Sequence, residues 1–321
     1  MKQSLLFIST ILLTLFLIAG VFIVRSRTNN VAENNQPAVA DTRVRIVATF
    51  YPLGEFSRQV IGGKGEVAVV VPAGVEPHEY EPTPQDIAAI YAADVFVVNG
   101  AGIDAWALKI RPDLEKNGVK VLVMSEILGF NEDSASDAAV DEDSGVDPHF
   151  WLDPKLVEQE LASIGAVVSA VDTKNQDVYT ENTITYTKKI QSIDDAYRQG
   201  LSKCVNKTVV TSHNAFAYMG KRYQFETLSI TGFSPESEPS TRQLADLATL
   251  ARQKNIQHIF FETLVSPRLA QTLADEIGAK TLVFNPLEGL SEEEIGQGKD
   301  YISVMTENLN NLQIAMQCYE Q

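Results

Sequence analysis

The chain has 321 residues, of which 45% are hydrophobic and 21% are charged, so it is neither a disordered nor a collagen-like protein. Its 26 basic and 42 acidic side chains give a formal net charge of −16, and we expect no nucleic-acid partner for so acidic a chain. The length predicts about two domains. The two cysteines are too few for a disulfide scaffold or a Cys-type zinc module.

Residues 1–27 are predicted to form an N-terminal membrane anchor or an export signal. Residues 5–24 carry no charge and lie between Lys2 and Arg25. A helix of this length spans roughly 30 Å, the thickness of the hydrocarbon core of a bilayer. A cleaved signal has a shorter apolar region with a small-residue cleavage site close behind it, so we favour a retained anchor and keep cleavage as the alternative. Residues 28–43 are polar and contain a proline, and they are predicted to be a linker.

The next part of the chain alternates short apolar runs with helical patterns. The predicted strands are 44–49, 66–71, 95–99 and 119–124. The predicted helices are 52–61, 84–92 and 103–116. Strands that alternate with helices indicate a parallel sheet, so residues 44–173 are expected to form an N-terminal α/β lobe.

The same pattern occurs a second time after a long helical middle. Residues 154–201 are predicted to form a shorter helix and then a long one from about Gln176, which gives a connecting helix over 174–203. The second set of predicted strands is 208–211, 227–230, 256–261 and 281–284. The helices among and after them are 215–222, 241–254 and 267–277. We therefore predict a C-terminal α/β lobe over 204–321, each lobe being a short, mostly parallel sheet flanked by helices.

The chain contains four histidines, and three of them follow predicted strands. His78 comes after the second strand, His149 lies beyond the fourth, and His213 ends the first strand of the second lobe. Open parallel sheets bind ligands in the crevice at the carboxyl ends of their strands. Three imidazoles that converge there are typical of a transition-metal site. His258 lies inside a predicted strand and is expected to be structural.

A tetrahedral site needs a fourth donor, and the end of the last strand offers two candidates. Glu288 supplies a carboxylate, whereas Asn285 would be only a weak neutral donor. We predict Glu288 as the fourth ligand, with a water molecule as the alternative. Glu262, at the end of the strand that contains His258, is either a reserve ligand or a partner of a ligand.

Six motifs occur in order along the chain: PHEYEPTPQD, DPHFWLDP, TSHNAFAY, SPESEPS, IFFET and NPLEGLSEEE. Together they resemble the zinc-binding branch of the zinc- and manganese-type metal ABC transporter substrate-binding proteins (solute-binding protein family 9). The resemblance covers nearly everything from residue 44 to 321. It implies two α/β lobes joined by a long rigid helix, with the metal in the interlobe cleft. Carried over by position, the histidine ligands fall on His78, His149 and His213, and the glutamate of one branch falls on Glu288.

This chain departs from the family pattern in three places. Val21 stands where many members have a lipid-anchored cysteine, so the anchor is expected to be the helix itself. The segment 131–147 has seven acids and no histidine, and we expect a solvated loop there. Asn285 stands where other members have an aspartate, which strengthens the dependence on Glu288. The resemblance implies an extracytoplasmic monomer, attached to the cell membrane, that delivers its ion to an ABC transporter permease.

Ligand chemistry favours Zn²⁺ over Mn²⁺ as the captured ion. Three neutral imidazoles and one carboxylate suit tetrahedral Zn²⁺, whereas Mn²⁺ prefers sites with more oxygen ligands. We therefore predict a zinc-capture protein and not an enzyme. The alternatives are a manganese-binding protein of the same family or a zinc hydrolase that uses the three histidines and a water. A cell-adhesion role as a second activity is left open.

The two cysteines are far apart in sequence. Cys204 precedes the first strand of the second lobe, and Cys318 lies in the C-terminal helical segment. An exported domain favours a disulfide between them, with two free thiols as the alternative.

Overall fold

The computed structural model describes residues 43–130, 140–141 and 145–319. The predicted anchor over 1–27, nearly all of the linker over 28–43 and most of the acidic segment 131–147 lie outside these residues. Within the described part of the chain, no helix is both long enough and apolar enough to cross a membrane.

The first lobe contains a four-stranded parallel sheet in the order β2-β1-β3-β4. Its strands are β1 (Val44–Ala48), β2 (Gly65–Val69), β3 (Val95–Val98) and β4 (Lys120–Val123). Helices α2 (Tyr51–Ile61), α3 (Pro84–Tyr91), α4 (Ala105–Lys116) and α5 (Met124–Ile127) follow the successive strands. All four residues of β3 are buried, as expected for a central strand that is covered on both faces.

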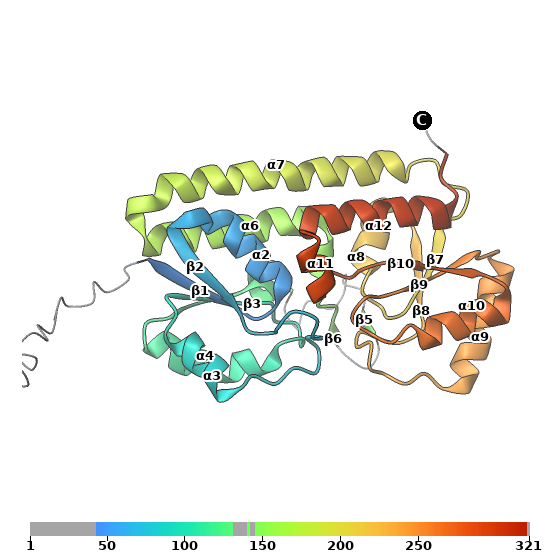
Figure 1. The fold of residues 1–321 in the computed structure, drawn as a ribbon, viewed down its shortest axis with the longest axis horizontal. Coiled ribbons are helices and arrows are strands. Elements are labelled where there is room, and N and C mark those ends of the chain that lie inside the picture. Colours follow the sequence, from blue (N-terminus) through green and yellow to red (C-terminus); the bar gives the residue numbers. More distant parts are fainter. Residues whose placement is uncertain (1–42, 131–139, 142–144, 320–321) are drawn as a thin grey trace, which may run out of the picture. The chain divides into compact units, whose positions relative to one another are not determined.

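Side chains alternate between the two faces of this sheet. Ile46 and Val97 pack with α2 and α6 (Pro154–Val171). Phe96 and Val98 pack on the other face against Ile90 of α3 and Leu114 of α4. Figure 1 shows the same layers, with α2 and α6 on one side of the sheet and α3 and α4 on the other.

The second lobe repeats the strand order of the first. Its parallel sheet has the order β10-β9-β7-β8, so in both lobes the first strand lies between the second and the third. The strands are β7 (Thr208–Thr211), β8 (Glu226–Ser229), β9 (His258–Phe261) and β10 (Lys280–Val283). The helices are α8 (Ala217–Tyr223), α9 (Thr241–Gln253), α10 (Arg268–Ile277), α11 (Glu292–Gly296) and α12 (Tyr301–Met316). The predicted α/β class is confirmed, although most strands begin or end a residue or two from their predicted limits.

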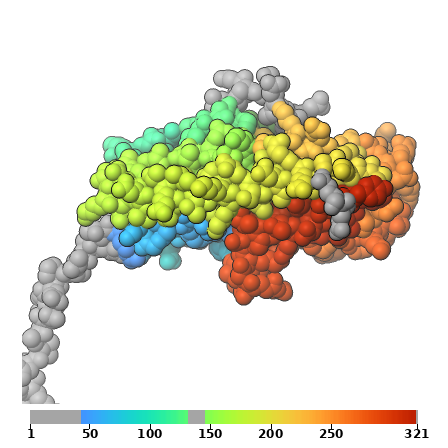
Figure 2. Space-filling model, turned by 90° about the horizontal axis from the view of Figure 1, so that it is seen from above, coloured from blue at the N-terminus to red at the C-terminus, as the bar shows by residue number. Residues whose placement is uncertain are grey.

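A single long helix, α7 (Gln176–Gly200), packs on both lobes. Its buried face contacts α2 and α6 of the first lobe and α12 of the second. Figure 2 shows α7 running along one face of the molecule from the first lobe to the second, with α12 beside its C-terminal half. The predicted fold of two lobes joined by a long helix is confirmed. The limits predicted for the lobes and the connecting segment stay a prediction.

Several elements were not predicted from the sequence. They are α5, α11 and a small antiparallel pair, β5 (Val140–Asp141) with β6 (Gly145–Val146). Helix α12 was predicted only as an unspecified C-terminal helical segment, and Cys318 lies just beyond its end. Cys318 forms a disulfide with Cys204, so the start of the second lobe is covalently tied to the end of the last helix.

The core of the first lobe contains an acid without a partner. Glu160 of α6 is completely buried, and neither of its carboxylate oxygens has a hydrogen-bond partner among the described residues. Burial raises the pKa of Glu160 from 4.5 to about 8. The folded protein therefore keeps this proton over a pH range in which the unfolded chain loses it, and stability falls as the pH rises from about 4.5 to about 8.

We expect Glu160→Gln to stabilise the protein increasingly as the pH rises through that range, because glutamine keeps the shape of the side chain without the titration. The gain in unfolding free energy should grow by up to about 1.4 kcal/mol per pH unit. Urea unfolding of the wild type and the variant, in EDTA and at several pH values, measures this gain. Subtracting the two unfolding free energies at each pH cancels the contribution of the groups that titrate in both proteins. A difference that stays constant with pH would contradict the assignment.

Candidate metal centre

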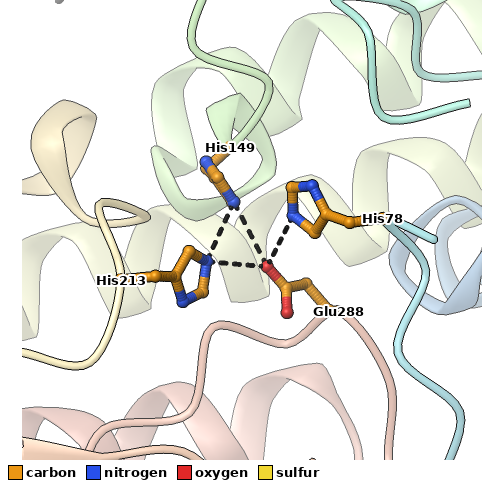
Figure 3. Close-up of side chains that lie close together, drawn as sticks. All are labelled: His78, His149, His213 and Glu288. Carbon is orange, nitrogen blue, oxygen red and sulfur yellow. Dashed lines mark hydrogen bonds and ion pairs between the residues drawn. The ribbon is translucent and has the colours of Figure 1, made fainter. Parts of the chain in front are cut away.

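Four side chains from four separate loops meet where the two lobes face each other. They are His78, His149, His213 and Glu288, and one potential ligand atom from each lies within 4.8 Å of the others. Figure 3 shows three imidazole rings pointing toward the carboxylate of Glu288. The structure therefore brings together all four of the residues that the sequence predicts as ligands.

Four of the six separations between these atoms match the edges of a small tetrahedron. Glu288 Oε1 lies 3.1 Å from His213 Nε2, 3.2 Å from His149 Nε2 and 3.4 Å from His78 Nε2. The Nε2 atoms of His149 and His213 are 3.2 Å apart. Ligands at zinc-like distances around one ion are separated by about 3.3 Å, which agrees with these four separations. The ligand atom of His78 lies within 4.8 Å of those of the other two histidines.

The second sheet directly positions His213 and its neighbour Glu262. His213 follows β7, and Glu262 follows β9, the strand that lies next to β7. This is the point where the strand order of the sheet reverses, which is the usual binding crevice of an open parallel sheet. The other ligand candidates reach the cleft on longer loops: His78 after β2, His149 before α6, and Glu288 after β10.

Two carboxylates lie behind the histidines and orient their rings. Glu262 Oε2 is 2.7 Å from His213 Nδ1, and Asp147 Oδ1 is 2.8 Å from His149 Nδ1. A carboxylate at Nδ1 keeps the proton there and leaves the Nε2 lone pair free for a metal ion. Glu262, predicted as a reserve ligand or as a partner of a ligand, is placed here as a partner of His213.

The role of Asp147 was not recognised in the sequence, where it was counted with the acidic segment. Its Oδ1 atom also accepts a hydrogen bond of 3.0 Å from the backbone N–H of His149. An aspartate two residues before a histidine can therefore fix both the backbone and the ring of that histidine. This local spacing is the signal that could have identified Asp147.

Asn285 shapes the Glu288 loop and does not point into the cluster. Its amide nitrogen donates to Thr263 Oγ1 at 3.1 Å and to Glu294 Oε1 at 3.2 Å. Its side-chain oxygen accepts from the N–H of Leu287 at 2.8 Å. Leu287 has a φ of 59°, a left-handed conformation that is costly for a branched residue and that this hydrogen bond helps to hold. The resulting turn directs Glu288 toward the histidines.

Burial and mutual charge set the protonation of the cluster. Burial alone raises the pKa of Glu288, but the charge of His213 and the hydrogen bonds from the three histidines hold it well below its ordinary value. Burial alone lowers the pKa of His213, but Glu262 and Glu288 raise it well above the usual range. The pKa of His149 is also raised, because the hydrogen bonds to Asp147 and Glu288 outweigh its burial. Burial lowers the pKa of His78. Without an ion, protons on the buried rings therefore balance the carboxylates.

Comparison with known proteins finds relatives that are named for zinc uptake or zinc binding. The family described as "Zinc-uptake complex component A periplasmic" matches residues 46–315. The "High-affinity zinc uptake system protein ZnuA" of Bacillus subtilis is 37% identical over 304 residues, which cover 93% of this chain and 95% of that protein. The "Zinc-binding lipoprotein AdcA" of Streptococcus pneumoniae is 38% identical over 288 residues, which cover 88% of this chain but only 57% of that longer protein.

Solved structures of similar proteins have the same fold as this chain. The crystal structure of the Zn(II)-bound ZnuA-like domain of Streptococcus pneumoniae AdcA matches with a TM-score of 0.73 and 37% identity, and the match covers 85% of this chain and 99% of that domain. A metal-dependent lipoprotein of Bacillus subtilis, YcdH, matches with a TM-score of 0.73 and 38% identity, over 85% of this chain and 99% of that chain. Both matches support the two-lobe fold.

We expect Glu262→Gln to weaken binding of a divalent ion at this cluster by about 10- to 100-fold, because the neutral amide orients the His213 ring less strongly and lowers its basicity. Glu226→Gln is the control, since Glu226 lies at the start of β8, where it pairs with Lys254 away from the cluster. Competition with a chelating dye measures both affinities. Equal affinities in the two variants would show that Glu262 does not support the site.

Proposed function

This chain belongs to the family of periplasmic zinc-uptake complex component A proteins, and from that premise we propose that it captures Zn²⁺ outside the cytoplasm for an ABC importer. The observation that carries the proposal is the meeting of three imidazole nitrogens and one carboxylate oxygen in a single buried cluster. They come from loops that are far apart in the sequence. Such a donor set is typical of a zinc site.

We propose His78, His149, His213 and Glu288 as the four ligands of the ion. Three neutral imidazoles and one carboxylate give the ligand set a net charge of −1, which leaves a bound Zn²⁺ site with one positive charge. The carboxylates of Asp147 and Glu262 are in direct contact with the ligand rings and offset that charge. Manganese is the second candidate ion, and it is disfavoured because nitrogen ligands predominate over oxygen ligands.

A capture role fits this geometry better than a hydrolase. A catalytic zinc keeps one position open for water, whereas the Glu288 carboxylate here occupies the fourth corner. Glu262 is a candidate for a general base, but it contacts Nδ1 of His213 on the side of the ring away from Glu288. We therefore propose binding and release without turnover.

Delivery follows from the division of the ligands between the lobes. His78 belongs to the first lobe, and His213 and Glu288 belong to the second, so an ion that contacts all three favours the arrangement in which the lobes are close. Helix α7 packs on both lobes and limits how far they can separate. We propose that a membrane permease recognises the loaded form, and that the protein acts as a monomer.

Two features support a location outside the cytoplasm. The Cys204–Cys318 disulfide is of a kind that persists in oxidising compartments. The apolar segment within residues 1–27 is long enough to serve as a membrane anchor. We propose that this segment tethers the protein to the cell membrane through the linker over 28–43.

We expect the purified protein to bind one Zn²⁺ tightly and Mn²⁺ at least about 100-fold more weakly in a chelator-competition titration, given the order of divalent affinities. His213→Ala should lose most of the zinc affinity, because it removes one ligand and leaves Glu262 buried without its partner. His258→Ala is the control, because His258 lies at the start of β9 outside the cluster. Comparable Mn²⁺ affinity would change the proposed ion, and no tight binding of either metal would refute the proposal.

We expect zinc affinity to fall as the pH falls, and to begin falling above the ordinary imidazole pKa of about 6.5. The raised pKa values of His213 and His149 mean that both rings hold protons that Zn²⁺ must displace. Each displaced proton lowers the apparent affinity by up to about tenfold per pH unit below its pKa. Titrations between pH 5.5 and 8 measure the slope. An affinity that does not change over that range would contradict the charge balance described above.

A further inference from the structure

His149 lies on a segment that belongs to the first lobe by chain order, but most of the side-chain hydrogen bonds that tie this segment to the rest of the protein go to the second lobe. Residues 147–153, here named the His149 segment, run from the end of β6 to the start of α6. The first lobe contributes one side-chain hydrogen bond, from the amide of Asn99 to the carbonyl oxygen of Pro148 at 3.1 Å, and packs the Phe50 ring against Trp151.

The second lobe holds the same segment through two tyrosine hydroxyls and a carbonyl group. Tyr218 donates to the carbonyl oxygen of Asp147 at 3.0 Å, and Tyr301 donates to that of Trp151 at 2.7 Å. The indole N–H of Trp151 in turn donates to the carbonyl oxygen of Pro286 at 2.8 Å. The two hydroxyls therefore fix the backbone on both sides of His149.

The elements that make these bonds are those that present the other ligands of the second lobe. Tyr218 lies in α8, which begins shortly after His213, and Pro286 lies in the loop that carries Glu288. Tyr301 is the first residue of α12, whose Asn308 donates to the Asn285 carbonyl oxygen at 2.7 Å in the same loop. The positions of His149, His213 and Glu288 are thus coupled through one set of hydrogen bonds.

A charge contact at the end of the His149 segment adds to this coupling. Arg222, also in α8, lies 3.3 Å from a carboxylate oxygen of Asp153, the residue that caps α6. The same guanidinium group makes two short hydrogen bonds to Asp194 of the connecting helix α7, at 2.7 and 2.6 Å. Helix α8 therefore contacts the His149 segment at both of its ends.

We propose that Tyr218 and Tyr301 are positioning residues for ion capture. They hold His149, the first-lobe ligand, at the distance from His213 and Glu288 of the second lobe that a shared ion requires. This inference rests on the proposed zinc-binding function. Neither hydroxyl touches the ion position, and each acts through the backbone of the His149 segment. Zinc–nitrogen bonds are short, near 2.0–2.1 Å, so a small displacement of the His149 ring weakens coordination.

The test compares three Tyr→Phe variants, each of which removes a single hydroxyl. Tyr218→Phe and Tyr301→Phe cut the hydrogen bonds to the His149 segment. Tyr197→Phe is the matched control, because its hydroxyl donates at 2.7 Å to the carbonyl oxygen of Met305, between α7 and α12. All three variants lose one buried or half-buried tyrosine-to-carbonyl hydrogen bond, so all three should lower the melting temperature of the metal-free protein.

We expect Tyr218→Phe and Tyr301→Phe to lower Zn²⁺ affinity by about three- to tenfold, in line with the loss of one neutral hydrogen bond that holds a ligand. Tyr197→Phe should change the affinity by less than about twofold. If all three variants lose zinc affinity equally, the hydroxyls act through general stability and the proposal is wrong. If Tyr218→Phe and Tyr301→Phe both bind as the wild type does, the proposal is also wrong.

A double-mutant cycle with His149→Ala separates positioning from any other effect of the hydroxyl. In the His149→Ala background, Tyr218→Phe should change zinc affinity by less than about twofold, because the ligand that it positions is gone. A full three- to tenfold loss in that background would overturn the inference. The wild-type titration keeps the two proposals apart: if the wild type does not bind Zn²⁺, the proposed function fails first.

Discussion

The carboxylate of Glu288 is buried between the two lobes, and three imidazole nitrogens lie within 3.4 Å of one of its oxygens. An ionised carboxylate is costly to bury unless positive charge or hydrogen-bond donors surround it. In the metal-free protein, protons on the raised-pKa histidines supply that charge, and a divalent ion supplies it when bound. The histidines that surround Glu288 come from three different loops, so the burial of this one carboxylate depends on all three loops.

The duplicated sheet explains where the side chains of the cluster lie. In the second lobe, the reversal point between β7 and β9 is used by His213 and its partner Glu262. In the first lobe, the equivalent point between β1 and β3 is filled by the buried Asp104, which accepts hydrogen bonds from Thr49 Oγ1 at 2.7 Å and from the Asn99 N–H at 2.8 Å. The first lobe therefore presents His78 and His149 from longer loops. Longer loops need support, and contacts with the second lobe provide part of it.

The sequence was sufficient to predict which four side chains meet in the cluster, because parallel strands end at one edge and residues that follow different strands converge there. This reasoning located His78, His149 and His213, and the last strand supplied Glu288. It could not predict that Tyr218 and Tyr301 hold the His149 segment, because the helices that bear them pack on it only through the tertiary fold. The burial of Glu160 was missed for a related reason. Nothing in the sequence pattern of α6 distinguishes an exposed glutamate from one that neighbouring elements of the fold bury.

The carboxylates that orient the rings also bear on which ion the cluster suits. An ion such as Mn²⁺ prefers about six ligands, most of them oxygen. The carboxylates of Asp147 and Glu262 are bonded to Nδ1 atoms on the outer sides of their rings, and the carboxylate of Glu76 accepts the backbone N–H of His78 at 3.1 Å. Asn285 offers no further oxygen, because its side-chain oxygen is bonded to the Leu287 N–H. Three ring nitrogens and one carboxylate oxygen are therefore the donors that the structure brings together, and a four-coordinate ion with an affinity for nitrogen is the one that this donor set suits best.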